Sequence, residues 1–178
     1  MRRLLFVGLA VACVGLIAGG VYALSQALTG RNEAKEKLAA EKIVTTEDAA
    51  IPNTPVTDHE TAHAMADVIA KHALEAAGGL TYSELGRFVS EADPEDPAGT
   101  SDEAAALKDE NDRPVSNPLR QVALQAVTLR SALLASALAF HLAELGMGVG
   151  VFLIAAGLIG VGFLWLLRLE RGVSPRSA

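Results

Sequence analysis

Residues 145–167 read LGMGVGVFLIAAGLIGVGFLWLL, which is 23 consecutive residues without a charged side chain. They end a longer apolar stretch that begins at Ser131. An α-helix rises about 1.5 Å per residue, so about 20 apolar residues cross the hydrocarbon core of a bilayer, which is about 30 Å thick. The sequence therefore predicts a transmembrane helix over 145–167.

A second uncharged run, residues 4–28, follows the N-terminal Met-Arg-Arg. Three interpretations are open: a retained transmembrane helix, a signal peptide cleaved after Ser25-Gln26-Ala27, or a lipoprotein signal that uses Cys13. The run is long for a signal peptide, and no large aliphatic residue stands three positions before Cys13. We therefore expect a retained first transmembrane helix over 4–28.

The charge of the chain is unevenly distributed. The whole chain carries a formal net charge of −6. Between Arg31 and Glu144 there are twenty acidic and ten basic residues, whereas the two ends are basic. No basic stripe is present that would neutralise phosphates, which argues against nucleic acid as a partner.

The basic ends also predict the topology. Lys and Arg beside a span stay in the cytoplasm, and long loops cross the membrane largely regardless of their charge. Residues 1–3 and 168–178 are then cytoplasmic, and residues 30–140 lie outside the plasma membrane. Four basic residues directly after the first span argue against this orientation: Arg31, Lys35, Lys37 and Lys42.

The region 29–90 is predicted to be extracytoplasmic and mainly helical. Residues 31–42 are rich in helix formers, so the first helix is expected to continue into water. Residues 57–60 form a T-x-x-E capping box, with Thr57 and Glu60 as partners, before a helix that ends at Gly78-Gly79. A second T-x-x-E box at 81–84 predicts a shorter helix, so the two helices form a hairpin.

The segment 91–116 is dominated by acidic residues. Nine of them lie between Glu91 and Asp112, against Lys108 alone. Such a segment buries too little apolar area to offset its ordering entropy, so we expect a disordered acidic linker. A calcium-binding loop is the alternative, but the spaced ligands and glycine of a recognised loop are missing.

Helical signals return at Asn117-Pro118, a good N-cap followed by proline at the first helical position. Apolar residues then recur on one helical face: Leu119, Val122, Ala126, Leu129 and Leu133. We expect an amphipathic juxtamembrane helix over 117–144 that continues without a break into the second span. A re-entrant turn at 146–150 is the alternative, and it would place Glu144 in lipid. The fold predicted as a whole is an all-α membrane protein.

The pentapeptide His59-Glu60-Thr61-Ala62-His63 matches H-E-x-x-H, in which two histidines one turn apart bind zinc and the glutamate acts as general base. A third ligand is needed, and Glu84 is the candidate. Against this site, Glu60 is already the expected capping partner of Thr57, and no large core surrounds the helix. We therefore expect no metal, no cofactor and no catalytic residue.

Three pairs of small residues stand four positions apart in the spans: Gly15 with Gly19, Gly146 with Gly150, and Ala156 with Gly160. This spacing lets helix backbones approach closely, so the glycines predict packing of the two spans on each other or on a partner. Membrane helices rich in Ala and Gly also contain such pairs without a packing role. Cys13 is the only cysteine and is expected to be a small packing residue in the first span.

Several segments carry a resemblance to a known family: EKIVTTEDA at 41–49, ADVI at 66–69, KHALEA at 71–76, TYSEL at 81–85 and LRSAL at 129–133. They resemble a family of small actinobacterial two-span membrane proteins, over about residues 38–165. Its members are usually labelled hypothetical, and some carry an aromatic-ring-opening dioxygenase label that nothing in these residues supports. The resemblance implies no activity, and the family does not characteristically have histidine at the positions of His59 and His63.

These observations favour a non-enzymatic accessory or scaffolding component of an actinobacterial cell-envelope complex. The expected partners are the lipid bilayer and a membrane protein or a second copy of the chain, with no small-molecule substrate. A membrane-tethered zinc peptidase built on His59, Glu60 and His63 is one alternative. Transport by a homo-oligomer is another, but residues 145–167 offer no polar group to line a pore.

Overall fold

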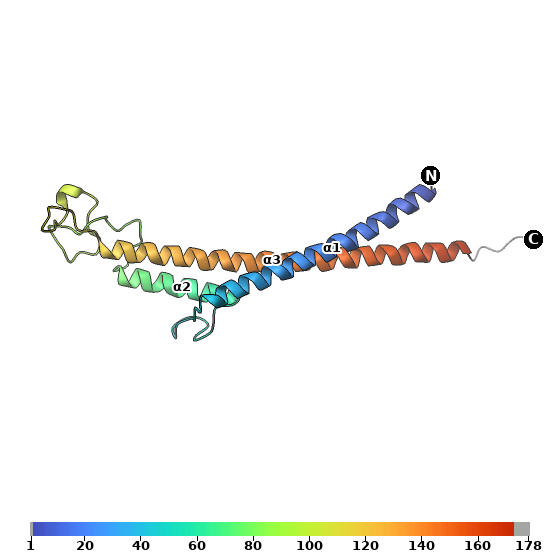
Figure 1. Ribbon diagram of the computed structural model, residues 1–178, viewed down its shortest axis with the longest axis horizontal. Helices are drawn as coiled ribbons and strands as arrows, with labels where there is room; N and C mark the ends of the chain where they lie inside the picture. The colour runs from blue at the N-terminus through green and yellow to red at the C-terminus, as the bar shows by residue number, and fades with distance from the viewer. Residues whose placement is uncertain (1, 173–178) are drawn as a thin grey trace, which may run out of the picture. The chain divides into compact units, whose positions relative to one another are not determined.

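The structure, a computed structural model, describes residues 2–172 (Figure 1). Its helices are α1 (Arg2–Ala40), α2 (His59–Ala76), a short 3-10 helix η1 (Glu103–Ala105) and α3 (Pro118–Gly172). Between residues 2 and 172 the only β structure consists of isolated bridges, so the prediction of an all-α fold is confirmed. The chain divides into a terminal unit, residues 1–35 with 139–178, and a central unit, residues 36–138.

Two of the helices are long and apolar enough to cross a membrane. The most apolar 18-residue segment has a mean hydropathy of 2.5 in α1 and 2.4 in α3. Only 11% of that segment in α1 and 17% in α3 is buried. The core helix of a soluble protein would be mostly buried, whereas large apolar side chains here are widely exposed. α3 is also one unbroken helix of 55 residues, as predicted, with no turn at 146–150.

In the terminal unit, α1 and α3 pack antiparallel. Gly146 lies against Ala27, and farther along α3 Gly157 lies against Ile17. At the far end of the pair, the Arg168 guanidinium carbon lies 5.0 Å from the centroid of the Phe6 ring. In this register α1 and α3 are in contact from Ala27 and Gly146 to Cys13 and Gly160, within the uncharged runs 4–28 and 145–167.

The N-terminus of α2 differs from the prediction. The N-cap is Asp58, not Thr57, and its partner is Thr61, not Glu60. The Thr61 amide donates to Asp58 Oδ1 at 2.9 Å, and both the Thr57 and Asp58 amides donate to the Thr61 hydroxyl. A carboxylate is a stronger acceptor than a hydroxyl, which explains why the cap moves by one residue. The capping role predicted for Glu60 is therefore wrong.

The helix predicted after Thr81 is a single turn. The Thr81 amide and hydroxyl both donate to Glu84 Oε2, at 2.8 and 2.7 Å, so the side chains of the box do pair. Beyond it, Phe88 exchanges two backbone hydrogen bonds with Thr100, at 2.9 and 2.8 Å. This pairing draws the chain into an extended conformation, and the expected helical hairpin does not form.

The segment 91–116, expected to be disordered, has a defined backbone. Val89, Leu107 and Val115 form a closed ring of backbone hydrogen bonds in which each amide donates to the carbonyl of another at 2.8–2.9 Å. Isolated bridges also join Ser90 to Ala106 and Lys108 to Pro114. The segment is a compact loop rather than a linker.

The aspartates of this loop explain why its high charge does not prevent order. In four places an Asp carboxylate accepts a hydrogen bond from the amide two residues ahead, at 2.8–3.2 Å: Asp93, Asp96, Asp102 and Asp109. Such Asx turns mimic a backbone turn and fix the chain direction locally. The prediction of disorder considered only the charge of these aspartates and not their carboxylates as hydrogen-bond acceptors in turns.

The core of the central unit is small and is held by the start of α3. Ala77, Leu85 and Ala123 are buried and are flanked by Leu80, Tyr82 and Leu119. Asn117 caps α3 as predicted, since its Oδ1 accepts from the Leu119 amide at 3.0 Å. The Arg120 guanidinium stacks over the Tyr82 ring and donates to the carbonyls of Tyr82 and Leu85. This arginine fixes the 80–85 turn against α3.

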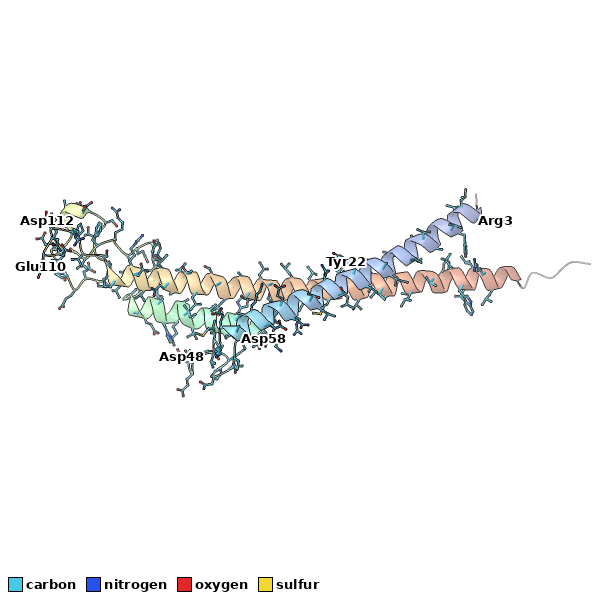
Figure 2. The ribbon with its side chains drawn as sticks, in the orientation of Figure 1. Arg3, Tyr22, Asp48, Asp58, Glu110 and Asp112 are labelled. Atoms are coloured by element: carbon cyan, nitrogen blue, oxygen red, sulfur yellow. The ribbon has the colours of Figure 1, made fainter. Side chains whose placement is uncertain are left out.

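The loop between α1 and α2 is tethered to α2 by Asp48, which Figure 2 labels together with Asp58 at the start of the helix. Asp48 Oδ2 lies 2.9 Å from Lys71 Nζ and 3.0 Å from His72 Nε2, and Oδ1 accepts from the Thr46 hydroxyl at 2.8 Å. The hydrogen bond from Lys71, followed by those from Thr46 and His72, holds the pKa of Asp48 well below its usual value.

Candidate functional site

The packing surface between α1 and α3 is lined by glycines, and three of the five predicted ones belong to it. A Cβ atom added at Gly150 would lie 2.8 Å from the carbonyl oxygen of Gly20, and one at Gly146 would lie 3.1 Å from the Ala27 Cβ. A Cβ at Gly160 would collide with the Cys13 sulfur. These α3 glycines allow the close backbone approach that the small-residue spacing predicts.

The other two predicted glycines do not face α3. A Cβ added at Gly15 or Gly19 would meet nothing within 4 Å, so this pair has no packing role within the terminal unit. Gly20 and Gly157, which the small-xxx-small pattern did not select, do lie in the contact. The missed signal is a 3–4 repeat along α1, in which every contact residue stands three or four positions from the next: Cys13, Ile17, Gly20, Leu24 and Ala27.

Cys13 fits the packing role expected of it. It is 3% exposed and lies against both Gly157 and Gly160 of α3. A larger side chain at position 13 would separate the helices, because glycine on the opposite helix leaves no side-chain atoms that could move aside.

The structure does not assemble the zinc site. His59 and His63 stand in the first turns of α2, and His63 lies 13 residues before its end at Ala76, roughly 20 Å by helical rise. Glu84 follows beyond that opposite end, where its carboxylate accepts from Thr81. Among the described residues, these three side chains do not form a group whose ligand atoms all lie within 4.8 Å of one another.

The central unit contains an apolar cavity of about 260 Å³, lined by α2, the turn after it and α3. Its lining residues are Ala70, Ala73, Leu74, Leu80, Thr81, Tyr82, Ala123, Ala126, Val127 and Arg130. It lies beside the small core, which shares Leu80, Tyr82 and Ala123 with it. A second, more open hollow shares Tyr82 and includes Val122 and Leu124.

Several apolar side chains beside these hollows face solvent. Leu74 and Val127 are 43% and 49% exposed although both line the cavity, and Val122 and Leu124 are similarly exposed beside the second hollow. Val122, which the sequence pattern places on the apolar face of an amphipathic helix, is among these exposed side chains. The central unit thus presents apolar surface that its own residues do not cover.

Comparison of the chain with protein-family models, curated proteins and solved structures finds no match. Its own geometry defines a class: an all-helical protein with two helices able to span a membrane and a small central unit that has an exposed apolar surface.

Proposed function

We propose that this chain is a membrane-anchored, non-enzymatic accessory or scaffolding protein of an actinobacterial cell envelope. The observation that carries the proposal is the exposed apolar surface of the central unit around Leu74, Val122 and Val127. Exposed apolar side chains gathered beside hollows, on a part of a protein that stands in water, favour a site for a partner. The partner is a larger membrane complex, and the central unit supplies the docking surface.

The terminal unit serves as the anchor. We propose that both spans are retained, that both termini are cytoplasmic, and that residues 30–140 are outside the plasma membrane. The antiparallel register supports this, because it aligns the run 4–28 with the run 145–167 and places Phe6 beside Arg168. A first helix that packs closely against the glycines of its partner helix has a structural reason to remain uncleaved.

The test is purification of the tagged full chain from native membranes in mild detergent, with mass spectrometry of everything retained. We expect a stoichiometric partner that Val127→Glu releases, because a charge on the docking surface cannot be buried without compensation. Asp67→Asn is the matched control, since Asp67 is an exposed polar residue of α2, and it should retain the partner.

Two outcomes of that purification would overturn the proposal. One is a chain that copurifies with no partner and does not associate with itself. The other is zinc near one per chain in elemental analysis of the same sample, lost in His63→Ala, which would restore the peptidase alternative.

A further inference from the structure

The cavity of the central unit exists because its walls are made of alanine. α2 contributes Ala70 and Ala73, and α3 contributes Ala123 and Ala126. Leucine at any of these positions would extend into the space, so the hollow of about 260 Å³ follows from a choice of small side chains. Its volume lies just below the range of roughly 300–1,000 Å³ in which proteins enclose drug-sized ligands. It is large enough for one alkyl chain and too small for two.

The polar groups of the cavity are few and distinct. The Thr81 hydroxyl is already engaged with Glu84 and Ser83. Within residues 2–172, the Tyr82 hydroxyl makes no hydrogen bond, and the Arg130 guanidinium makes neither a hydrogen bond nor an ion pair. An apolar wall with one exposed cation at its edge is complementary to an apolar ligand that ends in an anion.

We propose that this cavity binds a single-chain anionic amphiphile of the fatty-acid type. The alkyl chain lies among the four alanines, and the carboxylate pairs with Arg130, whose planar fork of N–H donors matches the two oxygens of a carboxylate. The Tyr82 hydroxyl donates a further hydrogen bond near the head group. This ligand site goes beyond the proposed function, although Leu74 and Val127 belong both to its lining and to the proposed docking surface.

The experiment uses the full chain in bilayers of zwitterionic phospholipid, with a decanoate probe that carries a photoreactive diazirine at the end of its chain. After irradiation, labelled peptides are mapped by mass spectrometry. We expect labelling of 70–82 and 123–130, reduced by excess decanoate and far less by decanol. Labelling of the two spans by probe dissolved in the bilayer provides an internal reference in every sample.

Two variants and one control make the test specific. Arg130→Gln should lower labelling of the cavity about threefold at a fixed probe concentration, because an exposed charge-assisted pair is lost. Ala126→Phe fills the cavity and should abolish that labelling. Arg31→Gln removes an exposed cation from α1 and should leave it unchanged. Circular dichroism of each variant separates loss of binding from loss of folding, and Arg130→Gln alters only an exposed side chain.

Labelling confined to the spans would overturn the proposal, as would cavity labelling that Arg130→Gln leaves unchanged. An acidic peptide of a partner could occupy the cavity instead. The decanoate probe would then fail to label the cavity, while the partner would still be retained in detergent. The failure of the ligand proposal is thus distinguishable from the failure of the docking proposal.

Discussion

Asp58 gives the sharpest prediction at the scale of single residues. Asp58→Ala removes the N-cap of α2 and should cost about 1 kcal/mol, the usual value for losing such a cap. The amides of the first turn should then exchange hydrogen roughly fivefold faster. Thr57→Ala is the control, because only the backbone of Thr57 takes part in the box. Equal effects of the two substitutions would restore Thr57 as the cap.

Asp48 predicts a pH dependence of the loop between α1 and α2. Its pKa is lowered in the folded chain, chiefly by Lys71, so its stabilising effect is present above the unfolded pKa of about 4 and is lost as the pH falls through the lower folded value. At neutral pH, Asp48→Asn should therefore increase proteolysis of residues 41–58. The difference from the unmodified chain should disappear in strong acid. A difference that does not shrink as the pH falls below 4 would contradict this role.

At the scale of elements, substitution should destabilise the helix pair at glycines of α3 that contact α1, but not at glycines that contact nothing. Gly150→Leu forces a side chain into the Gly20 carbonyl and should cost roughly 1–3 kcal/mol or more, the typical range for overpacking. Gly15→Leu has open space around it and should cost far less. The SDS concentration at which the α1–α3 pair unfolds measures the destabilisation caused by each substitution. Equal losses would show that the predicted Gly15–Gly19 pair also packs.

The single cysteine provides a direct test of the register. A Cβ at position 160 lies 3.8 Å from the Cys13 Cβ, which is the mean separation in disulfides. Gly160→Cys should therefore cross-link to Cys13 under mild oxidation in membranes, whereas Gly162→Cys, with nothing within 4 Å, should not. Cleavage at a protease site introduced between the helices reveals the bond on a gel. Its absence would mean that the register is wrong or that α1 is removed.

The long elements could be predicted well because a single strong physical requirement defines each of them. Apolar length defines the parts of α1 and α3 that could span a membrane, and Asn117-Pro118 defines where α3 begins. The predictions of short elements failed because two options of nearly equal free energy competed. The N-cap of α2 is Asp58 rather than the neighbouring Thr57. Backbone pairing of Phe88 with Thr100 outweighs the helical signal of 81–84.

The site was only partly predictable for a related reason. Glycine spacing found Gly146, Gly150 and Gly160 but could not tell which face of α1 they meet, since that depends on the register of two helices. No pattern in the sequence indicates the cavity beside Arg130. It arises where alanines distant in sequence come together, and only tertiary packing brings them there.

At the scale of the whole molecule, the proposed topology can be tested by labelling. In a Cys13→Ser background, a cysteine introduced by Ser101→Cys should react with a membrane-impermeant maleimide in intact cells, because Ser101 is exposed in the region proposed to be outside. A cysteine introduced by Arg176→Cys should react only after permeabilisation. The reverse pattern would assign residues 30–140 to the cytoplasm and give weight to the basic cluster after the first span.

Because of the Asx turns, the backbone path of the acidic loop depends on side-chain oxygen atoms and not on negative charge. Asparagine accepts the same hydrogen bond as aspartate at the same side-chain length, whereas glutamate keeps the charge but is one methylene too long. The loop is then free to vary in net charge by four through Asp93, Asp96, Asp102 and Asp109 while its path stays the same. Related chains should interchange aspartate and asparagine at these positions and avoid glutamate.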